Sequence, residues 1–336
     1  MFKENEKSVG TASELAYAKA ESAPARATDA DLKKERRFCS GIGWCFFAIV
    51  IVLTALQNAV PMLVFHCAPE FYLRHDDVVY ALAILSIYAA GYPLLALLCR
   101  RRERVQIKKR KKMGAANFLV LLMMCFGVAL LGSLLGEMVN AAIGAIQGSA
   151  VANPVEEAFS ENSVWISFVF AGICAPVVEE LVFRKILVDR LARYGEAAAV
   201  VMSGLMFGLI HGNFSQFFYA VFLGMLFAYV YAKTGRIGYT IALHLIINLS
   251  SSLMALVVMR ENASASVIST AWEVLLYGLD LAGIILLMVK RKKFVFEKGT
   301  VQLPKGKRAS VLWGNAGMMA YTLVCMALFG IMLIWA

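Results

Sequence analysis

Two adjacent glutamates, Glu179 and Glu180, lie in a stretch that is otherwise apolar enough for a membrane interior. A charge at the centre of a bilayer costs at least about 2.5–3.5 kcal/mol, so such groups need a partner or a function. On a helix Glu180 and Arg184 are one turn apart, and we expect an ion pair between them. Glu179 points elsewhere and is left to face a cavity. The spacing predicts a supporting role for Glu180 and Arg184 and a chemical role for Glu179, unless both glutamates simply reach water at a helix end.

Two histidines lie in later hydrophobic segments, each paired with another residue one helical turn away. Phe207 precedes His211 by four residues, so its ring can form a wall beside the imidazole. His244 precedes Asn248 by four residues, so an imidazole and an amide point the same way. A carboxylate with an imidazole can activate water, and a second imidazole with an amide can stabilise an oxyanion. These residue types predict hydrolysis of an acyl bond, with a peptide bond as the expected target.

The same residues have alternative interpretations. An intramembrane histidine such as His211 is often a hydrogen-bond partner between helices, and Asn248 with the serines at 250–252 could join helices in the same way. Glu179, His211 and His244 could also ligate Zn²⁺, which accepts carboxylate oxygen and imidazole nitrogen. The sequence contains no HExxH, GxSxG or Walker motif. A metal-dependent and a metal-independent hydrolase therefore both remain open.

Hydrophobic helices must position these residues. The chain has 336 residues, of which 60% are hydrophobic, and its mean hydropathy is +0.69. Soluble domains have about 45–50% apolar residues, and several runs here reach the roughly 20 residues that cross a bilayer as a helix. The seven cysteines show no CxxC pattern, so we expect neither a disulfide framework nor a thiolate zinc site. We predict an all-α polytopic membrane protein with eight or nine transmembrane helices, at about 41–65, 77–99, 114–147, 164–193, 196–212, 214–233, 237–259, 268–289 and 313–336.

The basic residues predict an orientation for these spans. If the spans alternate, all of the 33 Lys and Arg residues except Arg74 and Arg260 fall on one side. Basic loops are retained in the cytoplasm. We therefore expect a multi-pass protein of the cell membrane with a cytoplasmic N-terminus and an external C-terminus. Membrane topology accounts for the net charge of +10, so the bilayer is the expected partner and no nucleic acid is.

Helix lengths test whether the site residues can meet. The helices that carry Glu180 and His211 join near Gly195, which is 15 residues after Glu180 and 16 before His211. An antiparallel hairpin therefore places both about 22–24 Å from the turn. His244 lies eight residues after Arg236, only about 12 Å along its helix. Either helix tilt or a turn sunk into the membrane must bring His244 level with the others.

Three motifs in this order on successive hydrophobic helices carry a family resemblance: EExxxR at 179–184, FxxxH at 207–211 and HxxxN at 244–248. They resemble the CPBP family of intramembrane proteases, which includes Rce1-type CAAX prenyl endopeptidases and bacteriocin-processing Abi-type enzymes. The resemblance covers about 164–255 and implies a helical fold with an intramembrane site open to water.

The resemblance also implies a role for each matched residue. Glu179 would be the base and His211 its partner, His244 and Asn248 would stabilise the oxyanion, and Glu180, Arg184 and Phe207 would support them. Members are often called metalloproteases, but the motifs do not decide whether Zn²⁺ is required.

We divide the chain into a disordered cytoplasmic tail (1–38), N-terminal transmembrane helices (39–160), a protease core (161–256) and C-terminal transmembrane helices (257–336). The predicted function is that of an intramembrane endopeptidase acting on a peptide or a membrane-associated protein. One alternative is a catalytically silent scaffold or immunity protein. Another is an ion-coupled transporter that uses the remaining intramembrane acids, Glu137, Glu273 and Asp280. The substrate and the oligomeric state are left open.

Overall fold

The computed structural model describes residues 28–110, 112–154, 164–258 and 263–335, and within these ranges it contains helices and connecting segments but no strand. Eight of the described helices are long and apolar enough to cross a membrane. The predicted all-α polytopic architecture is therefore confirmed. The remaining predicted span, at 196–212, is a shorter helix that ends at Leu209.

Along the chain the helices are α2 (Asp29–Cys67), α3 (Pro69–Arg74), α4 (Asp76–Cys99), α5 (Ala115–Gln147), α7 (Val164–Val169), α8 (Ala175–Glu180), α9 (Asp189–Leu191), α10 (Glu196–Leu209), α11 (Phe214–Thr234), α12 (Ile237–Val258), α13 (Ala263–Lys290), α14 (Arg308–Leu312) and α15 (Ala316–Trp335). Two π-helical segments, Phe170–Cys174 and Leu181–Val188, flank α8 and join α7 to α9 in one continuous helical path. Single 3₁₀ turns lie at Ala192–Tyr194, Arg291–Lys293 and Lys305–Lys307.

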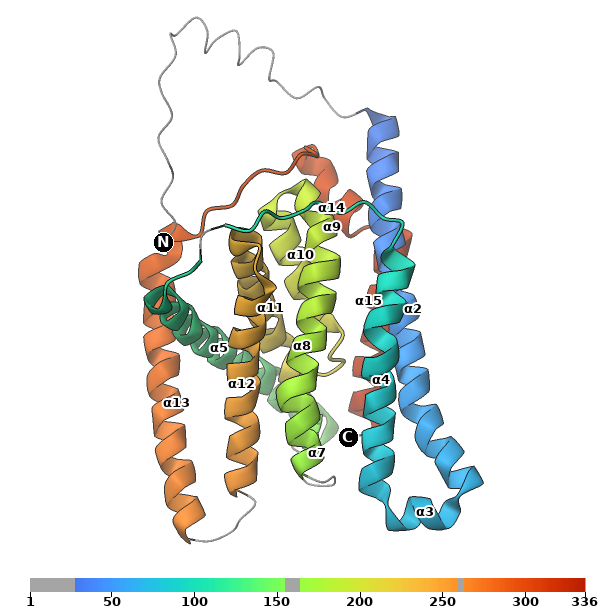
Figure 1. Cartoon of the computed structure of the whole chain (residues 1–336), viewed down its shortest axis with the longest axis vertical. Coiled ribbons are helices and arrows are strands. Elements are labelled where there is room, and N and C mark those ends of the chain that lie inside the picture. The colour runs from blue at the N-terminus through green and yellow to red at the C-terminus, as the bar shows by residue number, and fades with distance from the viewer. Residues whose placement is uncertain (1–27, 111, 155–163, 259–262, 336) are drawn as a thin grey trace, which may run out of the picture.

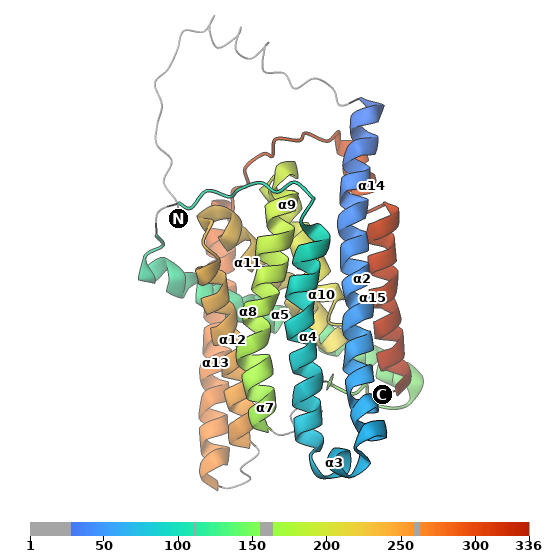
Figure 2. The ribbon, with the colours of Figure 1, turned by 45° about the vertical axis from the view of Figure 1, so that its right-hand side comes forward.

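The helices form three groups that lie side by side (Figure 1). On one flank α15 packs against α2, and α2 packs against α4. On the other flank α13 packs against α5, which in turn packs against α11. Between them in Figure 1 lie α8, α10, α11 and α12, the helices that carry or adjoin the three motifs. In Figure 2, α13, α12, α8, α4 and α2 follow one another across the front of the view. Many large apolar side chains on the flanks are exposed, among them Met138, Ile146 and Leu323, as expected for surfaces that face lipid.

The path through α7 and α8 is widened where a proline interrupts it. Pro176 has no N–H to donate, and its ring crowds the carbonyl four residues earlier, at Gly172. The π-helical turn Phe170–Cys174 lies directly before this proline and contains Gly172. A Cβ on Gly172 would lie 3.3 Å from Ser252 Oγ of α12. The wide turn and the glycine thus let α12 approach the glutamate-bearing helix closely.

A row of glycines brings α10 and α11 together. A Cβ on Gly204 would lie 2.8 Å from the carbonyl oxygen of Val221, and one on Gly208 would lie 2.8 Å from that of Phe217. Only hydrogen fits at these two positions, so the backbones of the two helices come into contact. This close packing seats the FxxxH segment deep in the bundle.

The first helix begins earlier than the sequence predicted. Thr28 and Asp31 form a reciprocal capping box at the N-terminus of α2, which starts at Asp29. The predicted disordered tail of 1–38 is therefore wrong for residues 29–38, because a capped helix outweighs their polar composition. Residues 1–27 lie outside the described ranges, as do residues 155–163.

Two extended segments cross one end of the bundle, at the top of Figure 1. We call residues 103–110 the N-terminal strap and residues 294–304 the C-terminal strap. The first donates from Val105 N to the Asp189 carbonyl (2.6 Å) and from Arg110 N to the Thr234 carbonyl (3.0 Å). The second donates from Val301 N to the Arg193 carbonyl (2.8 Å). Both straps are thus fixed by backbone hydrogen bonds to the ends of the central helices. We call this end of the bundle, with its two straps, the basic end.

Candidate active site

Glu180 is held from two sides. Its side chain and that of Arg184 are both 0% exposed, and Arg184 Nε lies 3.0 Å from Glu180 Oε2. His244 Nδ1 lies 3.0 Å from the other oxygen, Oε1. The ion pair predicted from the four-residue spacing is present. Since both oxygens are engaged, this carboxylate ties α8 to α12 and offers neither oxygen to a substrate.

The buried guanidinium of Arg184 also lies over two aromatic rings. Its Cζ is 5.1 Å from the ring centroid of Phe207 and 5.5 Å from that of Phe227. None of its nitrogens has a hydrogen-bond partner within the described part of the chain. A desolvated cation over an aromatic face gains about 2 kcal/mol, which offsets part of the cost of burial. Arg184 thereby links the glutamate pair to the FxxxH motif.

His244 reaches the glutamates because α12 begins below the N-terminal strap. The turn before α12 is held under this strap: Arg236 Nε donates to the Arg110 carbonyl (3.1 Å), and Gly235 adopts a left-handed conformation (φ 61°). His244 Nε2 lies 3.7 Å from Glu179 Oε2. The imidazole of His244 therefore lies between the two glutamates.

His211 follows α10 in the tight turn that leads to α11. Its Nδ1 lies 2.7 Å from the carbonyl oxygen of Phe207, so Nδ1 carries the proton and Nε2 presents a lone pair. The two rings meet edge to face at 5.0 Å between centroids, and the Phe207 ring also meets that of His244 at 5.8 Å. Phe207 forms the expected wall, and its carbonyl additionally orients the imidazole.

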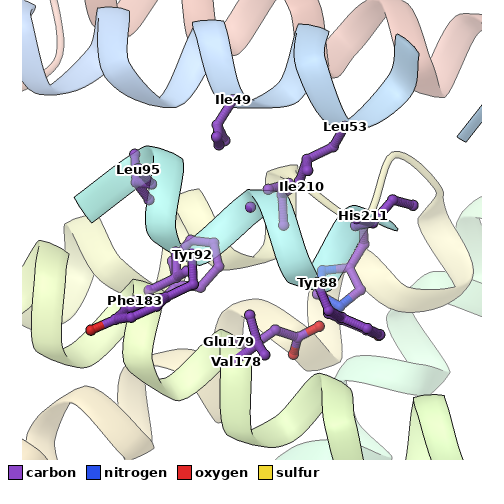
Figure 3. A pocket seen from close by; sticks show the side chains of 13 residues that line it. Ile49, Leu53, Tyr88, Tyr92, Leu95, Val178, Glu179, Phe183, Ile210 and His211 are labelled. Atoms are coloured by element: carbon purple, nitrogen blue, oxygen red, sulfur yellow. The ribbon is translucent and has the colours of Figure 1, made fainter. Parts of the chain in front are cut away.

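Glu179 and His211 line a common cavity of about 220 Å³. The Glu179 side chain is 28% exposed, in contrast to the sealed Glu180. Figure 3 shows the Glu179 carboxylate and the His211 ring directed into the cavity next to Tyr88. A carboxylate beside an imidazole with a free nitrogen, in a space large enough for several waters, can activate water for attack.

Part of this cavity comes from helices that the sequence analysis did not connect with the site. Tyr88 and Tyr92 of α4 line it, together with Ile49 and Leu53 of α2. Both pairs have the four-residue spacing of one helix face. That spacing is a usable signal for a shared face, but nothing in it indicates which cavity the face lines.

Asn248 lies apart from this cavity. Its Nδ2 donates to the carbonyl oxygen of Ala171 at 3.0 Å, and the residue lines a second cavity formed by α5, α11 and α12. The structure thus brings Glu179, Glu180, Arg184 and His244 into direct contact, and brings His211 to the cavity of Glu179. Asn248 is one helical turn from His244 but faces the other cavity.

The predicted zinc ligands do not fit a metal ion as they are placed. In the described ranges no group of three or more His, Cys, Asp or Glu side chains is arranged to hold one. His244 Nδ1 is occupied by Glu180 and His211 Nδ1 by the Phe207 carbonyl. Each ring keeps its Nε2, and one nitrogen is all that a metal-bound histidine supplies, so the objection lies in the placement of the groups and not in their chemistry. No step below is derived through a metal.

Comparisons with known proteins point to a membrane peptidase. Residues 161–250 match the sequence model of a family described as type II CAAX prenyl endopeptidase Rce1-like, and this range contains all three motifs. A protein of Bacillus subtilis (strain 168) named "Putative membrane peptidase YdiL" is 29% identical over 121 residues, which are 36% of this chain and 49% of that protein. The chain thus spans about half the length of this relative. No solved structure matches the chain significantly.

Proposed function

Since residues 161–250 belong to the CPBP family of intramembrane proteases, we propose that this chain is an intramembrane endopeptidase in which Glu179 activates the attacking water. The family predicted from the three motifs is thereby borne out. The observation that carries the proposal is the contrast within the glutamate pair. Glu180 is sealed by Arg184 and His244, while Glu179 opens into a cavity shared with His211.

In this proposal a water lies in the cavity between the Glu179 carboxylate and His211 Nε2. Glu179 takes a proton from the water as the oxygen attacks the carbonyl carbon of the peptide bond. The lone pair of His211 Nε2 accepts the second hydrogen of the water and so orients it. The bond between His211 Nδ1 and the Phe207 carbonyl keeps Nε2 turned toward the cavity. Proton transfer from Glu179 to the departing amine would complete the hydrolysis.

His244 and Asn248 are proposed to stabilise the oxyanion. Because Nδ1 of His244 is committed to Glu180, its ring can donate to a substrate oxygen through Nε2 only as an imidazolium. The Asn248 amide would exchange its bond to the Ala171 carbonyl for one to the substrate. Preorganised donors of this kind contribute about 10²–10³ in rate.

The proposed substrate is a peptide or a membrane-associated protein, because the family acts in the bilayer and the cavity of Glu179 lies among membrane-length helices. We further propose that the basic end faces the cytoplasm, since residues 100–112 and 290–308, which contain the two straps, carry 17 of the 33 Lys and Arg residues.

A cleavage assay tests the proposal. The full chain in lipid nanodiscs is incubated with a proteome-derived peptide library, and new termini are counted by mass spectrometry for wild type, Glu179→Gln and Glu273→Gln. Glu273→Gln is the matched control, because Glu273 is also a membrane-helix glutamate and lies exposed on α13. We expect Glu179→Gln to lose about 10²–10⁴ in rate, as removal of a general base does, with unchanged thermal unfolding.

Full activity of Glu179→Gln would contradict the assignment of the base. A wild-type chain that cleaves no more than Glu179→Gln would favour the silent scaffold instead. A chelator arm asks separately whether any cleavage depends on Zn²⁺, which the family resemblance leaves open.

A further inference from the structure

A second cavity, distinct from that of Glu179, is lined by α5, α11 and α12 and has a volume of about 410 Å³. Its polar lining includes Ser133, Glu137, Ser215, Gln216, Asn248 and Ser252. An adjoining space of about 460 Å³ shares Glu137 and adds Asn140 and Ser149. We call the two together the polar cavity and the adjoining space its side lobe. Asn248 is the one fixed position of the three motifs among the described residues that line the polar cavity.

Glu137 is the one carboxylate among the described residues that line the polar cavity. It lies exposed in α5, and no ion pair joins it to another described residue. A carboxylate in a membrane-spanning helix is costly unless a cation or water compensates it. The position therefore calls for a positively charged partner.

Asn140 gives a second, independent sign of a missing donor. Its side chain is only 7% exposed, and its Nδ2 donates to Ser215 Oγ at 2.9 Å. Its Oδ1 has no hydrogen-bond partner within the described ranges. Asn140 and Glu137 both line the side lobe. A buried acceptor left unpaired costs about 1–3 kcal/mol. Because Oδ1 is itself closed off from solvent, a donating ligand would remove this cost once the Asn140 side chain turns toward the side lobe.

None of the described residues that line the polar cavity is a Lys or Arg. The sequence from 113 to 183, which includes all of α5, contains no Lys or Arg. The part of α11 that lines the cavity and all of α12 contain none either. The positive group must come from outside these helices.

The size of the cavity favours an organic cation over a metal ion. A water molecule takes up about 30 Å³, and an ion held by Glu137 and Asn140 would leave most of the polar cavity empty. The side chain of a lysine or arginine carries only donors at its tip and an apolar stem that can run along the remaining wall. A carboxylate, an amide oxygen and hydroxyl groups match such a tip.

The polar cavity reaches the catalytic residues through Asn248. This residue lines the cavity and lies one helical turn after His244, whose Nε2 is 3.7 Å from Glu179. One residue of an extended peptide spans about 3.3 Å. A side chain bound in the cavity would therefore belong to a residue only a few positions from the bond that is cleaved.

We propose that the polar cavity binds the cationic side chain of a lysine or arginine residue of the substrate peptide, with Glu137 as its counter-ion and Asn140 Oδ1 as an acceptor. This inference rests on the proposed function, because it assigns the occupant as substrate. It makes Glu137 a specificity-determining residue that takes no part in the chemistry.

Binding is measured first, without cleavage. The Glu179→Ala chain in phosphatidylglycerol nanodiscs, which contain no lipid amine, is titrated with two labelled heptapeptides that differ only in a central lysine or norleucine. We expect the lysine peptide to bind about tenfold more tightly, which corresponds to about 1.4 kcal/mol. Adding Glu137→Gln should bring the ratio of the two affinities to about one, whereas adding Glu273→Gln should leave it unchanged.

An equal affinity for the two peptides, or a ratio that Glu137→Gln leaves intact, would overturn the proposal. Loss of the lysine preference on adding phosphatidylethanolamine would identify a lipid amine as the occupant and would also overturn it. These outcomes do not depend on turnover, so they remain distinct from a failure of the proposed protease function.

The active chain gives the second readout. In the peptide library, wild-type cleavage sites should be enriched in Lys or Arg at one fixed position from the cleaved bond. Glu137→Gln should abolish the enrichment while cleavage of other sites continues, and Glu137→Lys should shift it toward Asp or Glu. Cleavage without any basic preference in the wild type would refute the cation site while leaving the protease proposal standing.

Discussion

Glu180 and Glu297 show the same arrangement in two different surroundings. Glu180 joins Arg184 and His244 inside the bundle. Glu297 of the C-terminal strap joins Arg110 of the N-terminal strap and Lys233 of α11. The side chains of Glu180 and Arg184 are 0% exposed, whereas those of Glu297 and Arg110 are 54% and 43% exposed.

The difference shows how exposure to water changes the strength of such a set of ion pairs, which we call a junction: the inner junction around Glu180 and the outer junction around Glu297. Two charges 4 Å apart interact by about 1 kcal/mol in water and far more in a medium of low dielectric constant. At the basic end water and salt can replace a lost partner. Around Glu180 neither water nor salt can replace a lost partner, because the side chains are fully buried. Each charge there therefore depends on the others. The inner junction can fix the site accurately, and the outer one can only hold the straps in place.

The largest effect is expected from breaking the inner pair. Arg184→Met and Glu180→Gln should each lower the free energy of unfolding by about 3–5 kcal/mol, because each leaves a buried charge without its counter-charge. The double variant should lose less than either single variant, since it removes both charges. Unfolding in mixed SDS and detergent micelles, followed by tryptophan fluorescence, measures all three.

The matched pair at the basic end is Arg110→Met with Glu297→Gln. Both singles should stay within about 1 kcal/mol of wild type, as exposed pairs do. If the inner double variant were as unstable as the sum of its singles, the interdependence assigned to Glu180 and Arg184 would be wrong. If Glu180→Gln abolished turnover in a chain of normal stability, the division of roles between the two glutamates would fail.

An intermediate effect is expected at Lys233. Its side chain is 7% exposed, and its Nζ lies 2.6 Å from Oε2 of Glu196, which is 10% exposed. Lys233→Met should cost about 1.5–3 kcal/mol, the usual range for a hydrogen bond to a charged group. Lys185→Met is the control: Lys185 is 45% exposed, and its partner Asp189 keeps a 2.7 Å hydrogen bond from Tyr231. Equal losses of unfolding free energy in the two variants would show that burial does not determine how much each ion pair contributes to stability.

A smaller loss of stability, with a larger loss of activity, is expected at Phe207. Phe207→Leu and Phe227→Leu each remove a ring from Arg184 and a ring contact with His244. Each should cost about 1–2 kcal/mol of stability. Only Phe207 also contacts the ring of His211, so Phe207→Leu should reduce cleavage of the peptide library the more strongly. Equal cleavage by both variants would refute the role of that contact in positioning His211.

Local spacing predicted the parts of the site that lie on one helical turn. The Glu180–Arg184 pair and the contact between Phe207 and His211 follow from four-residue spacings, and both are present. The position of His244 does not follow from spacing, because it depends on where α12 starts. The N-terminal strap, more than a hundred residues earlier in the chain, holds that turn in place.

Other features were hidden for similar reasons. The Asn248 amide reaches the Ala171 carbonyl, which belongs to a π-helical turn whose altered register no periodicity reveals. Tyr88 lines the cavity of Glu179 from a helix about ninety residues away in sequence. The start of α2 could have been found from the Thr28 and Asp31 capping box, which composition alone conceals. Contacts between distant segments thus decide what local patterns leave open.

The smallest effect is expected at Glu297 and should depend on salt and pH. Glu297→Gln should cost less than about 1 kcal/mol, and the cost should shrink as salt is raised, because exposed pairs are screened. Glu70→Gln provides the control, since Glu70 belongs to a loose exposed pair with Arg74 (3.9 Å). Unfolding at low and high salt measures both variants.

The pH dependence has a defined sign. The hydrogen bond from Arg110 lowers the pKa of Glu297 below its ordinary value of 4.5. A carboxyl with a lowered pKa in the folded state contributes stability that is complete above the ordinary pKa and is lost as the pH falls through the lowered pKa. The difference in unfolding free energy between wild type and Glu297→Gln should therefore be constant near neutral pH and decline below pH 4.5. A difference that grew as the pH fell would mean that the folded state favours the protonated carboxyl, and the outer junction would then not be an ion pair at all.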